Sequence, residues 1–154
     1  MGFNRRMAGP THPIHIESPM NRYFAGYLAA ALVVVALDAL WLGFIAKATY
    51  QQAIGHLMAE QPKLIAALVF YALYPLGLLI FAMAPQAEAP ALGRTIVMGA
   101  LFGFFAYGTY DLSNLATLKG WPVPLTLIDI AWGTSLSAAA AAAGKAALNW
   151  AASA

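Results

Sequence analysis

The sequence predicts an all-α integral membrane protein, a four-helix transmembrane bundle with a short interfacial helix between its first and second helices. The first observation is composition: 62% of the residues are hydrophobic and 9% are charged, against roughly 45–50% and about 25% in soluble domains. The second is four apolar stretches, each long enough at ~1.5 Å per residue to cross a ~30 Å hydrocarbon core. These two observations together exclude a soluble globular domain.

The predicted helices follow one another with short connections. The first transmembrane helix spans 23–45 and the second spans 64–83, and an interfacial helix within 46–62 separates them. The third spans 95–118 and contains a G-x-x-x-G pair that allows another helix to approach closely. A Trp-Pro-Val-Pro turn then reverses the chain into the fourth helix, 126–148, which includes a long alanine tract.

The N-terminal segment differs from the rest of the chain. Residues 1–21 contain three prolines, two arginines and no apolar period, so we expect a mobile cytoplasmic tail ahead of a transmembrane domain at 22–154. A signal peptide is the competing interpretation of the first apolar stretch, but that stretch exceeds the ~7–15 residues of a signal-peptide core. His12 and His15 have no further ligands nearby, and the chain has no cysteine. We therefore predict no metal site and no cofactor.

The basic residues indicate orientation rather than a nucleic-acid site. Eight Lys and Arg residues against six Asp and Glu give a net charge of +2. They are scattered singly, so we expect no nucleic-acid partner. With the N-terminus in the cytoplasm, five of them fall on the cytoplasmic side and three on the other. The positive-inside rule therefore favours cytoplasmic termini.

Three carboxylates are the candidate catalytic residues. Asp38 comes late in the first helix, Asp111 late in the third and Asp129 early in the fourth. Because the first and third helices run in one direction and the fourth runs back, all three fall in the same half of the bilayer. An ionisable residue within a membrane segment indicates a functional site, because its burial costs ~2.5–3.5 kcal/mol near a helix centre.

Aromatic and polar residues accompany these carboxylates. Trp41 follows Asp38 by three residues and Trp132 follows Asp129 by three, so each pair shares a helix face. In antiparallel helices each indole would lie near the carboxylate of the other helix. The remaining candidate substrate-binding residues at a similar depth are Tyr71, Tyr74, Tyr107, Tyr110, Asn114 and Lys119.

Structural roles compete with these functional ones. Asp129 follows Thr126 by three residues, so it also fits the first turn of the fourth helix as a cap. Asp111 also fits an ion pair with Lys119 near the interface. Asp38 has no such partner in its own helix and needs one from elsewhere in the bundle.

Four segments of the chain resemble a family of small bacterial membrane proteins, domain of unknown function 2177. The segments are Asp38-x-x-Trp41-Leu42-Gly43, Phe70-Tyr71-x-x-Tyr74-x-x-Gly77, Tyr110-Asp111-Leu112-Ser113-Asn114-Leu115-Ala116-Thr117-Leu118-Lys119-Gly120-Trp121-Pro122 and Asp129-Ile130-x-Trp132-Gly133. The resemblance covers about 23–145, and it departs from the family pattern at Ser113, where Thr is usual. It implies a four-helix protein of the bacterial inner membrane and carries over no activity.

Three functions fit these features. The first is binding, with or without chemical modification, of a lipid or another membrane-soluble substrate, in which an aspartate acts as general acid or base. The second is a proton- or cation-coupled transporter, which would need a homodimer because four short helices seldom enclose a pathway. The third is a non-catalytic assembly subunit whose polar residues hold helices together. The sequence favours the first and leaves open whether the protein is an enzyme.

Overall fold

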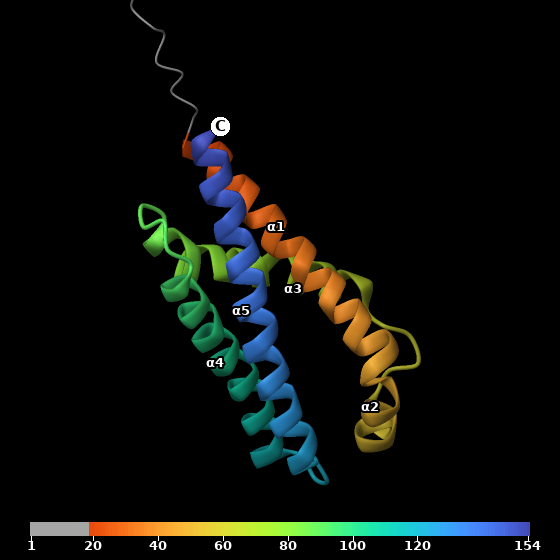
Figure 1. Cartoon of the computed structure of the whole chain (residues 1–154). Helices are drawn as coiled ribbons and strands as arrows, with labels where there is room; N and C mark the ends of the chain where they lie inside the picture. Colours follow the sequence, from red (N-terminus) through yellow and green to blue (C-terminus); the bar gives the residue numbers. More distant parts are fainter. Residues whose placement is uncertain (1–18) are drawn as a thin grey trace, which may run out of the picture.

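The structure is a computed structural model that describes residues 19–154, and within that range it contains helices and no strand (Figure 1). The α-helices are α1 (Pro19–Leu40), α2 (Lys47–Ile54), α3 (Leu64–Leu78), α4 (Gly93–Thr117) and α5 (Val123–Ser153). Two π-helical turns, Trp41–Ile45 and Leu79–Met83, continue α1 and α3, and two 3₁₀ turns occupy Gly55–Leu57 and Ala84–Gln86. The predicted all-α class is confirmed.

The helix boundaries follow the apolar stretches of the sequence closely. With their π turns, α1 ends at Ile45 and α3 covers 64–83, both as predicted. The start of α1 differs, because the helix begins at Pro19 and so includes part of the predicted tail. The rest of that tail, with His12 and His15, lies outside the described residues.

Three helices are long and apolar enough to cross a membrane, judged by length and composition over the described residues. They are Met20–Ile45, Leu64–Gln86 and Val123–Ser153. The 25-residue helix α4 is not one of them, because glycines, tyrosines and Asp111 dilute its apolar residues. The fourth transmembrane helix therefore stays a prediction.

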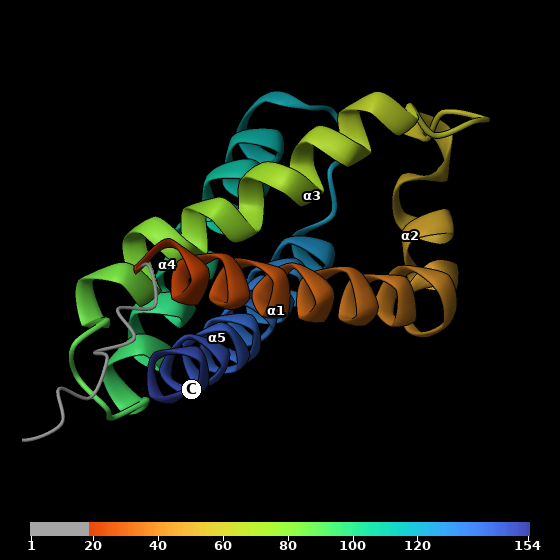
Figure 2. The same cartoon turned by 90° about the horizontal axis from the view of Figure 1, so that it is seen from above.

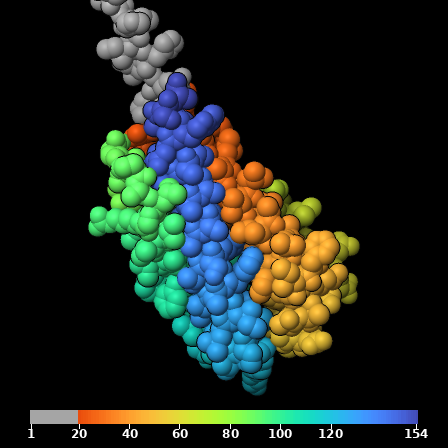
Figure 3. Space-filling model, in the orientation of Figure 1, coloured from red at the N-terminus to blue at the C-terminus, as the bar shows by residue number. Residues whose placement is uncertain are grey.

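Helix α5 is the centre of the arrangement. It runs back between α1 and α4, one on each side, while α3 crosses behind α1 (Figures 1 and 2). The space-filling view shows α5 in blue flanked by α1 in orange and α4 in green (Figure 3). Small residues permit this packing: a Cβ atom added at Gly99 of α4 would lie 2.5 Å from the Ala141 Cβ and 2.8 Å from the Ser137 carbonyl oxygen. The predicted close approach at the G-x-x-x-G pair is confirmed.

The core is small and the outer surface is apolar. Ala30, Val34, Leu78 and Ala140 are fully buried at the centre of the core. Large apolar side chains face outwards instead, and Ile65 is 80% exposed. A soluble protein avoids such a surface, whereas a bilayer solvates it. The described structure therefore has the exterior expected of a membrane protein.

Helix α2 closes one end of the molecule. It follows the π turn Trp41–Ile45 at the end of α1 and leads towards the start of α3 (Figure 2). None of its residues is fully buried. The short helix expected within 46–62 is present, and it lies beside the site described next.

Candidate functional site

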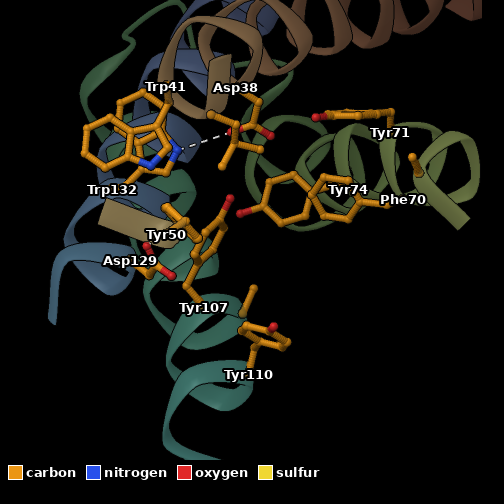
Figure 4. A pocket seen from close by; sticks show the side chains of 13 residues that line it. Asp38, Trp41, Tyr50, Phe70, Tyr71, Tyr74, Tyr107, Tyr110, Asp129 and Trp132 are labelled. Atoms are coloured by element: carbon orange, nitrogen blue, oxygen red, sulfur yellow. Dashed lines mark hydrogen bonds between the residues drawn. The ribbon is translucent and has the colours of Figure 1, made fainter. Parts of the chain in front are cut away.

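A cavity of about 550 Å³ lies where the end of α1, helix α2, the start of α3, the end of α4 and the start of α5 meet (Figure 4). Pockets that bind small molecules have about this volume. Its lining residues are Asp38, Trp41, Leu42, Tyr50, Ala67, Phe70, Tyr71, Tyr74, Ala106, Tyr107, Tyr110, Asp129 and Trp132. Eight of the eleven residues that the sequence singled out are in this set.

Asp38 is held by the indole of another helix. Its side chain is 4% exposed and accepts a hydrogen bond of 3.2 Å from Nε1 of Trp132, which α5 contributes. The predicted contact between the indole of one helix and the carboxylate of the other is therefore confirmed for this pair. Trp132 also stacks on Trp41 with ring centroids 4.3 Å apart and an interplanar angle of 7°. The two indoles form one wall of the cavity (Figure 4).

Asp129 has a different partner from the one expected. Its carboxylate is 4% exposed and accepts a hydrogen bond from the hydroxyl of Tyr50 in α2. Nε1 of Trp41 is buried without a hydrogen-bond partner among the described residues, so it does not bond Asp129. Tyr50 takes the place that the sequence pattern gave to Trp41.

Tyr50 is the functional residue that sequence reasoning missed. The sequence predicts only a short interfacial helix within 46–62 and indicates no role for Tyr50. Closeness along the chain could have indicated it. Helix α2 starts two residues after the π turn that contains Trp41, so its residues lie near the end of α1 that carries Asp38. Burial, and then the hydrogen bond to Asp129, raise the pKa of the Tyr50 hydroxyl. The hydroxyl therefore stays protonated at neutral pH and donates a hydrogen bond to Asp129.

The capping interpretation of Asp129 is wrong. Helix α5 begins at Val123, its N-terminus has no side-chain capping hydrogen bond, and Asp129 lies well inside the helix. The Thr126 hydroxyl instead accepts a hydrogen bond of 3.1 Å from Nε1 of Trp121. Asp129 is therefore free of a helix-starting role and faces the cavity.

Four tyrosines predicted for the site line the same cavity from α3 and α4. The Tyr74 and Ser137 hydroxyls are hydrogen-bonded at 2.7 Å. Tyr107 packs edge-on against Tyr74, with ring centroids 6.2 Å apart. The hydroxyl of Tyr71 points towards Asp38, and Tyr110 extends from α4 on the side away from Asp38 (Figure 4). These side chains give the cavity an aromatic lining with several hydroxyl groups.

Three predicted residues lie outside the cavity lining. Asn114 is partly buried and Lys119 is exposed. Asp111 is fully buried, and neither of its carboxyl oxygens has a hydrogen-bond partner among the described residues. The expected ion pair between Asp111 and Lys119 is therefore not formed. The ion pair that the described residues do contain joins Arg22 to Glu88 at 2.5 Å.

The charged side chains that line the cavity are all acidic. Its described lining includes two carboxylates and no Lys, Arg or His. The described residues also hold no group of three or more His, Cys, Asp or Glu side chains placed to bind a metal ion. The arrangement offers carboxylates and phenol hydroxyls as proton donors and acceptors inside an aromatic pocket.

Comparison with known proteins finds a family whose model covers most of the chain. The model of a family described as "Predicted membrane protein (DUF2177)" matches residues 23–146. Neither a curated protein nor a solved structure matches the chain. The matched range contains every residue of the cavity lining.

Proposed function

This chain belongs to the DUF2177 family of predicted membrane proteins, and we propose that it binds a lipid or another membrane-soluble molecule in the cavity around Asp38 and Asp129. The observation that carries the proposal is a pocket of about 550 Å³ in which two nearly buried carboxylates face an aromatic wall. A mostly apolar, aromatic pocket that also holds two carboxylates matches the two parts of an amphiphilic ligand.

The opening of the cavity supports a ligand that enters from the bilayer. Leu42, Phe70 and Tyr110 line the cavity and are 45%, 39% and 56% exposed. An apolar chain can therefore lie across these residues while its polar end reaches Asp38 or Asp129. This geometry favours an amphiphile over a water-soluble ligand.

The proposed topology places all four long helices across the bacterial inner membrane, with both termini in the cytoplasm. At ~1.5 Å per residue the 25 residues of α4 extend ~37 Å, which exceeds the ~30 Å hydrocarbon core. Five of its residues are buried within the protein: Thr95, Gly99, Gly103, Gly108 and Asp111. Its outer residues include Val97 and Phe105, 58% and 63% exposed. Because its buried face packs inside the protein and its outer face is apolar, α4 is suited to span the bilayer beside α5.

Asp38 and Asp129 are the residues we expect to contact the polar part of the ligand. Each accepts a hydrogen bond from a neutral donor, Trp132 and Tyr50 respectively. Each also retains acceptor capacity, because a carboxylate has about four lone-pair sites. If the ligand is modified, these two carboxylates are placed to exchange a proton with it.

The test is to identify what co-purifies with the protein when the cavity is open and when it is filled. Ala67 lines the cavity from α3, whereas its neighbour Ala66 is exposed outside the lining. We expect the native chain and Ala66→Trp, extracted in a mild neutral detergent, to retain the same bound molecule by native mass spectrometry. Ala67→Trp should lose it. Identical bound molecules in all three proteins would refute the proposal.

A further inference from the structure

The negative charge of the cavity has no counterion within the described protein. Arg22 is paired with Glu88, and the buried Lys145 ammonium donates to the Ala87 carbonyl oxygen at 2.9 Å. The remaining basic side chains of the described residues are exposed and outside the cavity lining: Lys47, His56, Lys63, Arg94 and Lys119. No basic side chain of the described residues therefore balances Asp38 and Asp129.

The hydrogen-bond donors of the two carboxylates carry no positive charge. The donors are an indole N–H from Trp132 and a phenol O–H from Tyr50, both neutral. A neutral donor satisfies one lone pair but leaves the charge in place, and a buried charge is costly unless it is paired. The missing positive charge must come with the ligand or with a proton.

The aromatic lining is suited to a positively charged ligand. Trp41, Trp132, Tyr74 and Tyr107 present π systems around the same space as the carboxylates (Figure 4). The face of an aromatic ring attracts an ammonium group within about 6 Å, and Trp does so most strongly. A phosphate or carboxylate ligand would find no cationic partner in the described lining and would be repelled by both aspartates.

We propose that the cavity binds an organic cation, an amphiphile whose primary or quaternary ammonium group sits between Asp38 and Asp129 against the aromatic wall. The inference rests on the proposed function and narrows its ligand class. The alkyl part lies towards the exposed opening at Phe70 and Tyr110. The ammonium comes either from a lipid headgroup or from a free cationic amphiphile, and both sources share this recognition chemistry.

The test compares ligands that differ in charge. The full chain in neutral detergent is titrated with dodecyltrimethylammonium, dodecanol or dodecyl sulfate, and binding is followed by the fluorescence of its tryptophans. We expect the cation to bind at least tenfold more tightly than the alcohol, and the sulfate to bind most weakly. Asp38→Asn and Asp129→Asn, which retain the side-chain shape, should each raise the Kd of the cation at least tenfold. Glu60→Gln removes an exposed carboxylate outside the cavity and should leave it unchanged.

The outcomes separate the two proposals. If cation and alcohol bind equally tightly and Ala67→Trp abolishes both, the binding function stands and the cation inference is overturned. If Ala67→Trp binds each probe as the native chain does, the probes bind elsewhere and both proposals fail. Repeating the titration in nanodiscs of phosphatidylethanolamine and of phosphatidylglycerol identifies the source. Competition confined to phosphatidylethanolamine indicates a lipid headgroup, and equal affinity in both indicates a free cation.

Discussion

Replacing Tyr50 with Phe should increase the local opening of α2 away from the helices it contacts. The Tyr50 hydroxyl donates to Asp129, and it makes the only side-chain hydrogen bond of α2 within residues 19–154. No residue of α2 is fully buried, so we expect this hydrogen bond to contribute a large part of the attachment of α2. Tyr50→Phe keeps the ring and removes only the hydroxyl.

The expected magnitude follows from the charge of the acceptor. A hydrogen bond to a charged group contributes about 1.5–3 kcal/mol, and each ~1.4 kcal/mol is a factor of ten in an equilibrium constant. Local opening of α2 should therefore rise ~10–150-fold. Asp129→Asn keeps an acceptor without the charge, so its effect should be smaller.

Hydrogen exchange of the backbone amides in nanodiscs measures this opening. Amides of 47–57 should exchange faster in Tyr50→Phe, while those in the middle of α5 should not change. Tyr27→Phe is the matched control, because it removes a hydroxyl that donates to the Ala72 carbonyl oxygen at 3.1 Å, far from α2 in sequence. Exchange of 47–57 at the native rate in Tyr50→Phe would refute the reasoning.

The same hydrogen bond gives a pH dependence with a defined sign. Burial and Asp129 raise the Tyr50 pKa in the folded protein, so the stabilisation is complete below the unfolded value of ~10. This stabilisation is lost as the pH rises from that value through the higher pKa of the folded state, because the Tyr50 hydroxyl ionises more readily in the unfolded chain than in the folded one. In Tyr50→Phe this alkaline loss of α2 protection should be absent.

Three further predictions concern packing, burial and topology. Gly103→Ala should lower the free energy of unfolding in detergent by ~1–3 kcal/mol, because the new Cβ would overlap the α5 backbone. Gly43→Ala is the control and should leave it unchanged, because the space around Gly43 is open. Asp111→Leu, which keeps the branched shape, should raise stability by up to ~1–3 kcal/mol, because it removes a fully buried carboxyl without a partner; a loss of stability would show that this carboxyl is paired. Reporter fusions within 85–90 and within 120–122 should report opposite sides of the membrane, and the same side for both would disprove the proposed fourth span.

The sequence alone determined where the helices lie along the chain and which helix faces carry Asp38 and Asp129. An apolar stretch in lipid must form a helix, because no water is present to satisfy its backbone groups, so the limits of the second helix could be read from composition. The spacing of Asp38 and Trp41, matched by Asp129 and Trp132, placed two helix faces towards each other. The Trp132 to Asp38 hydrogen bond shows that this inference was correct.

The tertiary structure alone decided which residues share the cavity. Asn114, Lys119 and Asp111 are predicted for the site yet lie outside the lining. Tyr50 is not predicted for the site, yet its hydroxyl donates a hydrogen bond to Asp129. Periodicity fixes which residues share a face of one helix, but it does not fix how that helix is rotated against its neighbours. That rotation depends on where small residues let helices approach, and the direction of a short connecting helix such as α2 depends on the turn before it. Both are settled by packing between segments far apart in the chain, which no local pattern records.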